Sequence, residues 1–501
     1  MSYLVLFDTD RIQDYVFATQ KLRAMRGGSF LLERLNRETR ETIMARGGQV
    51  IYVGGGAGAA RFEDKTSALN FCCALEAEYR KETIIAGITT CIAEQTAGES
   101  FKDWLERAEK GLRRRKDAKD RSIPLVNNPY AKVCEFCGRL PAEGDPVKNK
   151  YICMACKIQW DMGMNYKHSL IYKAIEEKFA FTSITWPESL EDIGQASDPE
   201  GYIGLIYADG NRMGQRRQDE LKRCQDTEVE EKYWQFSECV DKATRWAMVD
   251  AVTELLGQPV ANKPYPVQFF ITGGDDMLAA VPAQQAVPIA LKFGELFEQY
   301  YKVGRPEEDV GESFAGMGQD ASVAMGAALA KQNYPLHSLI NTARQLQKSA
   351  KQLAWKVWKE TGKDVSTIDF LATSSSLLKP IQEQRAEELA YDQLRLTQRP
   401  YAIDDAGKLV ELIRGLKSSG FPQNKVNDLW RPLYRGRLAA CLDFLVLLSR
   451  LSDRGGDSPQ QALAEVAKEF NLSPFPWRLT PDFHYITPLL DLAELYDFIN
   501  L

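Results

Sequence analysis

The chain has 501 residues, of which 44% are hydrophobic and 26% are charged. This composition is typical of a soluble globular protein, and the length corresponds to about three or four domains. A net charge of −6, from 63 basic and 69 acidic residues, argues against a protein that coats DNA without sequence preference. No stretch is apolar for long enough to span a bilayer, and no secretory pattern precedes the first predicted strand. We therefore expect a cytoplasmic protein without a membrane partner.

The first part of the chain is predicted to form an α+β domain. Its apolar runs are typical of buried strands, and the second run ends in a glycine-rich turn, Gly54-Gly55-Gly56. The expected elements, in chain order, are a strand over residues 4–8 that ends at Asp8, a strand with its turn over 50–57, a strand over 83–89 and a helix over 101–119.

Two Cys-x-x-Cys pairs follow, Cys134 with Cys137 and Cys153 with Cys156. Their spacing supplies the four thiolates of a tetrahedral structural zinc site, as in zinc ribbons. Disulfides and redox cysteines are poor alternatives in a reducing cytoplasm. We therefore predict one structural Zn²⁺ bound by these four cysteines, with no open position for catalysis.

The pattern of the first domain then recurs. The expected elements of the second copy are a strand over 204–208 that ends at Asp209, a strand over 267–271 that runs into Gly273-Gly274-Asp275-Asp276, a strand over 322–328 and a helix over 335–351. The matching order of elements indicates two ferredoxin-like palm domains. The alternative is that two unrelated α+β domains look alike by chance.

The two copies differ in their acidic residues. The first has Gly56-Ala57 where the second has Asp275-Asp276, although Asp8 corresponds to Asp209. Three carboxylates at neighbouring strand ends suit a divalent cation, and such a cation suits phosphoryl or nucleotidyl transfer on a nucleoside triphosphate. We predict that Asp209 and Asp275 hold Mg²⁺ or Mn²⁺ and that Asp276 is a second ligand or supports the first. The alternative is an ordinary hairpin turn, because Gly-Gly-Asp is common turn chemistry.

We expect an α+β protein with two palm domains, a zinc-binding element, helical insertions and a helical C-terminal domain. The predicted boundaries are 1–125 for the first, degenerate palm, 126–198 for a zinc-binding and helical domain, 199–372 for the second, catalytic palm, and 373–501 for the C-terminal helical domain.

These residues resemble the large palm-domain subunit of type III CRISPR–Cas effector complexes. Residues 8–17 (Asp-Thr-Asp-Arg-Ile-Gln-Asp-Tyr-Val-Phe) and 21–29 (Lys-Leu-Arg-Ala-Met-Arg-Gly-Gly-Ser) resemble the opening of that family's first palm. Gly273-Gly274-Asp275-Asp276 resembles its catalytic motif, and the four cysteines resemble its zinc element. The resemblance covers essentially the whole chain and is closest to the type III-B form. Many members carry an N-terminal HD nuclease domain, which this sequence, with three histidines and no His-Asp dipeptide, is expected to lack.

The resemblance implies a nucleotidyltransferase that makes cyclic oligoadenylate second messengers from ATP within an antiviral complex containing other effector subunits, guide RNA and target RNA. It implies nucleotide contacts at Gly273 and Gly274, and phosphate contacts at Lys351, which can equally be a solvated helix lysine. Gly54, Gly55 and Ser29 would hold a second ATP, although the Gly27-Gly28-Ser29 segment can equally be a helix break. The basic run 113–116 either contacts RNA or triphosphates or forms a solvated helix face.

Two other functions stay open at the level of sequence. One is a free-standing GGDEF-like nucleotide cyclase, although such enzymes usually pair two separate chains. The other is a catalytically silent scaffold of the RNA-guided complex. The three acidic residues of the second copy argue against the scaffold, because unliganded convergent carboxylates repel one another.

Overall fold

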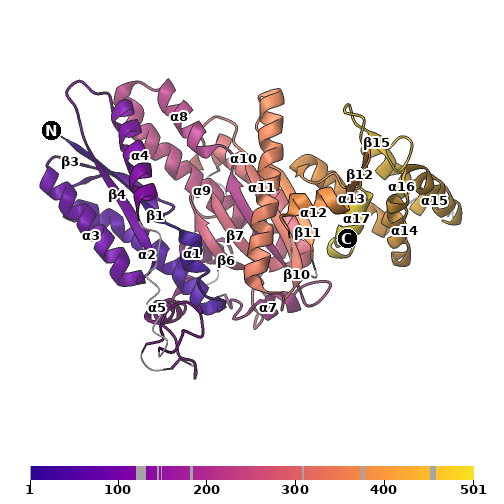
Figure 1. The fold of residues 1–501 in the computed structure, drawn as a ribbon, viewed down its shortest axis with the longest axis horizontal. Helices are drawn as coiled ribbons and strands as arrows, with labels where there is room; N and C mark the ends of the chain where they lie inside the picture. Colours follow the sequence, from indigo (N-terminus) through magenta and orange to yellow (C-terminus); the bar gives the residue numbers. More distant parts are fainter. Residues whose placement is uncertain are drawn as a thin grey trace.

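The computed structural model describes residues 2–119, 131–143, 146–147, 149–180, 184–306, 310–373, 379–451 and 458–501. Along its longest axis lie a first palm, a second palm and a C-terminal region (Figure 1). The predicted α+β class is confirmed, with a separate sheet in each palm. Within these ranges, no helix is both long and apolar enough to cross a membrane. The predicted domain boundary at 125/126 lies outside the described residues.

The first palm is an antiparallel sheet covered by helices on both faces. The strand order is β2-β3-β1-β4. Alternate residues of β1 enter different clusters: Val5 and Phe7 pack with α2 and α3, while Leu4 and Leu6 pack with α4. The elements are β1 (Tyr3–Asp10), α1 (Ile12–Val16), α2 (Leu22–Ala45), β2 (Gln49–Gly54), β3 (Ala57–Phe62), α3 (Lys65–Thr83), β4 (Gly87–Glu94) and α4 (Phe101–Ala118).

The second palm repeats this arrangement and extends it. Its sheet has the order β14-β11-β10-β5-β7-β6, in which β14 is Tyr401–Ala402 from the C-terminal region. The part β6-β7-β5-β10 reproduces β2-β3-β1-β4. The elements are β5 (Tyr202–Gly210), α8 (Met213–Arg223), α9 (Val229–Leu256), β6 (Gln268–Gly273), β7 (Asp276–Pro282), α10 (Ala283–Val303), β8 (Gly304–Arg305), β9 (Phe314–Ala315), β10 (Val323–Lys331), α11 (Leu336–Thr361) and β11 (Thr367–Ala372).

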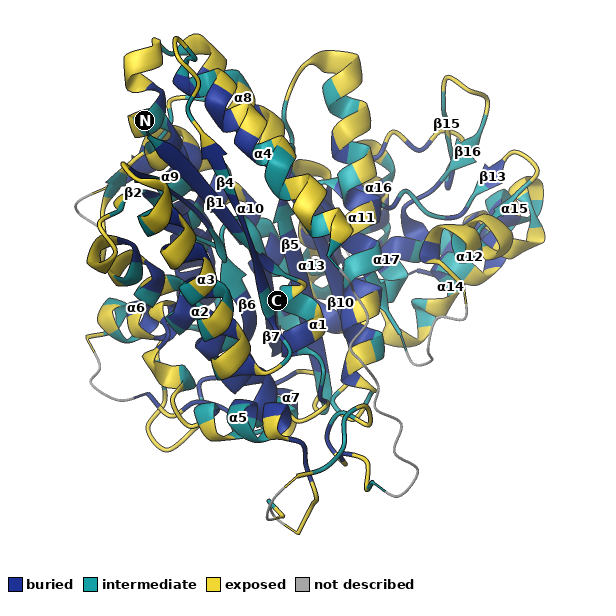
Figure 2. Cartoon of the chain, turned by 60° about the vertical axis from the view of Figure 1, so that its left-hand side comes forward, coloured by how far each residue is buried: buried dark blue, intermediate teal, exposed yellow. Residues whose placement is uncertain are grey.

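The two palms share one hydrophobic core. Leu31 and Leu35 of α2 belong to the same buried cluster as Leu205 of β5 and Phe270 of β6. Most strand residues of both sheets are buried, while exposed residues lie on the outward faces of the helices (Figure 2). The relative position of the two palms is therefore set by apolar packing, which holds their turns in a fixed relation.

One predicted strand of the first palm is displaced. The expected strand over 83–89 is instead the end of α3 at Thr83 followed by β4 from Gly87. The Thr83 hydroxyl donates to the Tyr79 carbonyl at 2.6 Å and accepts from the Ala86 amide at 3.0 Å. Ile84 then turns the chain at φ 67°. These local bonds outweigh the strand preference of the β-branched run.

The cysteine-bearing segment packs on the first palm. Its helices are α5 (Met154–Met162) and α6 (Leu170–Lys178), followed by the short α7 (Leu190–Gln195). A Cβ on Gly27 of α2 would lie 1.8 Å from the Gln159 carbonyl oxygen of α5. Gly27 therefore permits a close approach of two helices, and α2 continues through residues 27–29. The alternative that this segment is a helix break is wrong.

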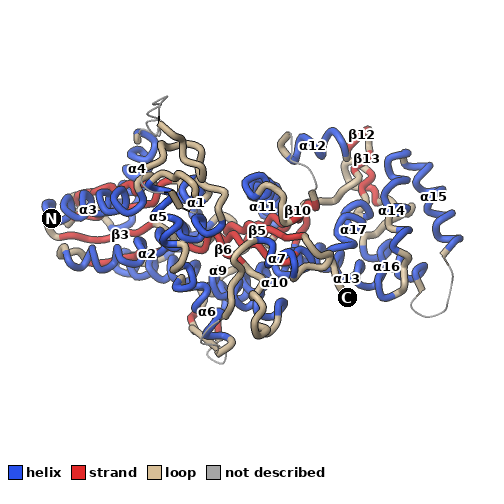
Figure 3. Tube along the Cα trace, turned by 90° about the horizontal axis from the view of Figure 1, so that it is seen from below, coloured by secondary structure: helices blue, strands red, loops and turns tan. Residues whose placement is uncertain are grey.

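The C-terminal region is largely helical but is not wholly so. A small sheet of order β12-β13-β16-β15 interrupts the helices, and β14 joins the sheet of the second palm beside β11. Figure 3 shows these helices clustered beyond that sheet. The elements are α12 (Ile381–Glu388), β12 (Ala390–Tyr391), β13 (Leu394–Arg395), β14 (Tyr401–Ala402), α13 (Ile403–Ser418), α14 (Asn427–Trp430), α15 (Arg437–Arg450), α16 (Pro459–Glu469), β15 (Arg478–Leu479), β16 (Tyr485–Ile486) and α17 (Leu489–Leu495).

Candidate functional site

The glycine-rich turns of the two palms face each other. Gly54 pairs with Ala57 in one hairpin and Gly273 pairs with Asp276 in the other, so each tip is a two-residue loop. Gly55 has φ 60°, and a Cβ built on it would lie 3.0 Å from the Gly274 nitrogen. The absence of a side chain at Gly55 therefore lets the two backbones approach closely.

The three predicted aspartates lie at the edge of the second sheet beside these turns. Ala208 of β5 pairs with Met277 of β7, so the next residues along, Asp209 and Asp276, face each other. Asp275 occupies the loop between β6 and β7. Two carboxylates at strand ends and one at the hairpin tip therefore lie at the same end of the strands of this sheet.

Helix α11 supplies two hydrogen-bond donors to Asp209. Asp209 Oδ2 accepts from Lys351 Nζ at 2.5 Å and from Gln347 Nε2 at 3.0 Å. Both donors lie on one face of α11, because residues four apart in a helix are neighbours. The Lys351 side chain keeps 40% of its surface exposed, so a ligand can reach its ammonium group.

The environment opposes ionisation of the other two aspartates. Burial, and then the charge of Asp209, raises the pKa of Asp275 to about 6. Burial, and then the charges of Asp209 and Asp275, raises the pKa of Asp276 to about 7. Tyr207 acts in the opposite direction, since its hydroxyl donates to Asp276 Oδ1 at 3.4 Å. Crowded carboxylates of this kind are relieved by a cation or a proton.

The carboxylate oxygens of the three aspartates are hard ligands of the kind that a divalent cation prefers, and a cation would relieve their mutual repulsion. The three carboxylates lie further apart than the four cysteine sulfurs do. Within the described ranges, only the four cysteines form a group of three or more ligand side chains whose ligand atoms all lie within 4.8 Å of one another. The three aspartates therefore lie at the same end of the strands, but their ligand atoms are not all within 4.8 Å of one another.

A cavity of about 310 Å³ lies between the palms. Both helices that flank it contribute residues at matching intervals: Ser29, Glu33 and Arg37 from α2, and Ser237, Asp241 and Arg245 from α9. Four of the predicted nucleotide-binding residues line this cavity, together with Asp276: Ser29, Gly54, Gly55 and Gly273. Its size is at the lower end of ordinary ligand pockets.

A second cavity, of about 430 Å³, lies beside α11. Lys351 lines this cavity rather than the one between the palms, together with Lys348 and Trp355 of the same helix. Asn211, which is 3% exposed, also lines it, and its Oδ1 has no hydrogen-bond partner among the described residues. Cationic and aromatic groups are therefore adjacent here.

The first palm has a cognate of the Asp209–Lys351 pair. Lys116 of α4 contacts Asp8 of β1, and α4 occupies the place that α11 holds in the second palm. Asp8 pairs with Ala57 in the β1–β3 register, so the first palm has an apolar residue where the second has Asp276. Two members of the basic run 113–116 are thus engaged within the chain, since Arg115 also lies 3.8 Å from Glu76, while residues 113–115 are exposed.

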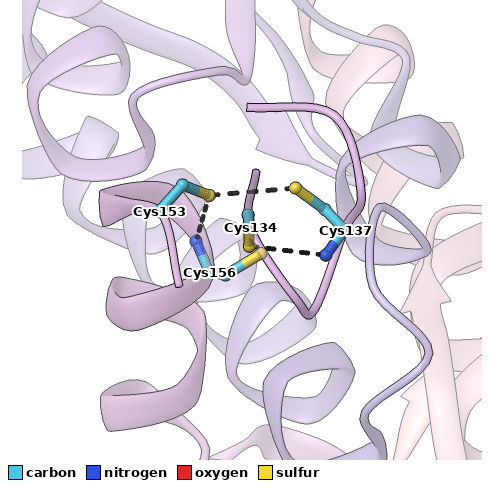
Figure 4. A group of neighbouring side chains, drawn as sticks. All are labelled: Cys134, Cys137, Cys153 and Cys156. Atoms are coloured by element: carbon cyan, nitrogen blue, oxygen red, sulfur yellow. Dashed lines mark hydrogen bonds between the residues drawn. The ribbon is translucent and has the colours of Figure 1, made fainter. Parts of the chain in front are cut away.

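The four cysteines converge as predicted. Figure 4 shows their sulfur atoms directed toward one another, and Cys137 Sγ lies 3.9 Å from Cys153 Sγ. Backbone amides of Cys137 and Cys156 each donate to the sulfur atom three residues earlier at 3.5 Å. Amide donors and a compact set of four sulfurs suit a tetrahedral zinc ion.

Sequence reasoning missed several residues of the site. Ser237, Asp241, Gln347 and Tyr207 were not singled out, although each lines the cavity between the palms or bonds to a predicted residue. An alignment of the two palms against each other would have revealed the shared Ser-x-x-x-acid-x-x-x-Arg spacing of α2 and α9.

Two palms, one of them carrying aspartates at its turn, define an α+β protein with a double-palm fold. More particularly, residues 202–357 match the family described as Cas10/Cmr2, second palm domain. No curated protein sequence matches the chain significantly.

The fold of the whole chain is similar to solved structures of Csm1. The crystal structure of Csm1 in T. onnurineus has a TM-score of 0.56 and 13% identity, over 99% of this chain and 69% of that chain. A Csm1–Csm4 cassette in complex with one ATP has a TM-score of 0.54 and 14% identity, over 92% and 68%. A Csm1–Csm4 cassette in complex with cA3 has a TM-score of 0.55 and 12% identity, over 100% and 70%. At these identities the likeness establishes the fold.

Proposed function

We propose that the chain is a nucleotidyltransferase that converts ATP into cyclic oligoadenylates as a subunit of a type III CRISPR effector complex. The observation that carries this proposal is the asymmetry of the palms: Asp275 and Asp276 stand where the first palm has Gly56 and Ala57. Asp209, Asp275 and Asp276 are the catalytic residues of the proposal. The similar Csm1–Csm4 structures in complex with ATP and with cA3 support the substrate and product classes.

Asp209 and Asp275 would hold Mg²⁺ or Mn²⁺, with Asp276 as a further ligand or support. A cation bound there lowers the pKa of a ribose hydroxyl and neutralises phosphate charge. Lys351 and Lys348 are assigned to the phosphates, because they present two cations to one cavity next to Asp209. No protein nucleophile is required.

The first palm would hold a second ATP through Ser29, Gly54 and Gly55, opposite Gly273 and Gly274 of the second palm. Ser29, Gly54, Gly55 and Gly273 line the cavity between the palms, and a Cβ built on Gly55 would lie 3.0 Å from the Gly274 nitrogen. Two nucleotides held on either side of this contact would place one ribose hydroxyl against the other α-phosphate, the arrangement that chain extension needs.

The remaining parts of the proposal concern assembly. Cys134, Cys137, Cys153 and Cys156 are assigned to one structural Zn²⁺. The partners are other type III effector subunits, with guide RNA and target RNA reached through the complex. The type III-B subtype, the lack of an HD nuclease domain and the bounds of the four domains stay predictions from the sequence.

The test is incubation of the purified chain with labelled ATP and Mg²⁺ or Mn²⁺, alone and with guide complex and target RNA. The double variant Asp275→Ala/Asp276→Ala should abolish product. Asp404→Ala/Asp405→Ala, an adjacent aspartate pair exposed on α13, is the matched control and should retain it. Product from the isolated chain would favour a free-standing cyclase, and no product despite intact assembly would favour a scaffold.

A further inference from the structure

The catalytic turn of the second palm is held from outside its own hairpin. Asp241, on α9, accepts a hydrogen bond at its Oδ1 from the backbone nitrogen of Gly274, at 3.1 Å. Gly274 has φ 61° and directly precedes Asp275 in the two-residue loop. A charged acceptor on a backbone N–H gives one of the stronger hydrogen bonds in proteins. The position of Asp275 is therefore coupled to the side chain of Asp241.

Asp241 is itself fixed by its neighbours. Arg245, one helical turn further along α9, places Nη1 at 3.1 Å from Asp241 Oδ2. The other guanidinium nitrogen, Nη2, lies 3.3 Å from Glu312, which also pairs with Lys242 at 2.9 Å. The Asp241 and Arg245 side chains are 29% and 16% exposed, so these contacts are partly shielded from water. One carboxylate oxygen of Asp241 therefore accepts the hydrogen bond from the turn, and the other pairs with Arg245.

The first palm offers an internal comparison. Glu33 occupies on α2 the place that Asp241 occupies on α9, four residues after a serine and four before an arginine, and both acids line the cavity between the palms. Glu33 Oε1 accepts from the Leu170 nitrogen at 3.0 Å instead of from a turn. Lining the cavity therefore does not by itself bring the acid to a hairpin. Only the acid of the palm that carries the aspartates bonds to its tip.

We propose that Asp241 is a positioning residue, which holds the Gly274-Asp275 loop in the geometry that cation binding and nucleotidyl transfer require. The role follows from the bond to Gly274, because a fixed loop leaves less reorganisation for the reaction. This inference rests on the proposed function for its catalytic part. Its structural part, the restraint of the loop, stands independently of activity.

Hydrogen exchange of the full chain tests the restraint directly. In Asp241→Ala we expect the Gly274 amide to exchange about tenfold faster or more, since it loses a charged acceptor. Asp241→Asn should exchange at an intermediate rate, because its side-chain oxygen still accepts but no longer pairs with the charge of Arg245. Glu33→Gln, the matched change in the first palm, should leave that amide unaffected. Unchanged exchange in Asp241→Ala would overturn the proposal.

Steady-state kinetics on the assembled complex tests the catalytic part. Asp241→Ala should lower kcat by up to about 100-fold and raise the cation concentration needed for half activity, while KM for ATP changes little. Asp241→Asn should recover part of kcat. A change confined to KM would make Asp241 a cavity-lining residue and refute its positioning role. If the wild type makes no product in any condition, the proposed function fails and the catalytic part falls with it, whatever hydrogen exchange shows of the loop.

Discussion

Replacing Asp276 with asparagine should stabilise the chain at pH 8 and have little effect near pH 4. The pKa of Asp276, about 7 in the folded chain, exceeds its ordinary value of 3.8 through burial and the charges of Asp209 and Asp275. Between these two values the folded chain keeps a proton that the unfolded chain has lost. The free energy of unfolding therefore falls as pH rises through this window. Asparagine has the same shape without the charge.

The magnitude follows from the pKa difference. At 1.36 kcal/mol per pH unit, the interval from 3.8 to about 7 corresponds to about 4 kcal/mol as an upper value. Asp276 is partly exposed and titrates together with its two neighbours, which lowers the expected gain to about 2 kcal/mol. A stability cost at a site proposed to bind a cation is an ordinary compromise between stability and function.

Denaturation by urea at pH 5, 6, 7 and 8 measures this effect, with Asp404→Asn on the exposed start of α13 as the matched control. The advantage of Asp276→Asn over the wild type should grow from pH 5 to pH 8. Mg²⁺ should stabilise the wild type at pH 8 more than the variant, because ligand binding favours the folded state. The reasoning fails if Asp276→Asn is the less stable protein at pH 8, or if the difference is constant with pH.

Three further predictions concern other parts of the molecule. Cys134→Ser should remove about one zinc per chain and lower the thermal midpoint, measured by metal analysis and calorimetry, while Cys73→Ser at an exposed thiol should do neither. Lys351→Met should reduce product formation by about tenfold or more with a raised KM for ATP, and an unchanged KM would contradict its phosphate role. Gly55→Ala should cost more stability, and more activity, than Gly47→Ala. Both glycines have positive φ, but only Gly55 faces another backbone, and equal losses in urea denaturation would show that the close approach is unimportant.

Both palms contain an ion pair between a strand-end aspartate and a helix lysine. It is Asp8 with Lys116 in the first palm and Asp209 with Lys351 in the second. The two aspartates of the turn, and the hydrogen bond that the Gly274 backbone nitrogen donates to Asp241, occur only in the second palm. Pairing a strand-end aspartate with a helix lysine is thus a shared feature of the fold, and the turn distinguishes the two copies.

Sequence patterns were reliable where local chemistry decides the outcome. The cysteine spacing predicted the cluster, because each Cys-x-x-Cys pair is already close in sequence and a single reversal of the chain brings the two pairs together. The two glycine-rich turns and the apolar runs before them predicted both hairpins, because alternating burial and positive φ are local demands. The repeat itself was visible as the order of elements, and the matched strand orders of the two sheets agree with it.

Local patterns misled where tertiary contacts compete with propensity. The run at 83–89 has β-branched residues but begins as a helix end, because Thr83 bonds its own helix and the following turn. The domain over 373–501 was expected to be helical, but α12 is followed there by β12 and β13. These strands pair with each other, and β13 also pairs with β16 near the end of the chain. Pairing partners this distant leave no trace in a local pattern.

The sequence by itself determined both hairpins and the order of elements in the two palms, and it identified the four thiols and the three carboxylates, because each of these depends on residues close together in the chain. The tertiary structure decided which surfaces meet: Gly55 against Gly274, α2 and α9 around one cavity, and Asp241 against the Gly274-Asp275 turn. These contacts depend on how two sheets share a hydrophobic core, and packing of that kind is set by shape across the whole chain rather than by the order of neighbouring residues.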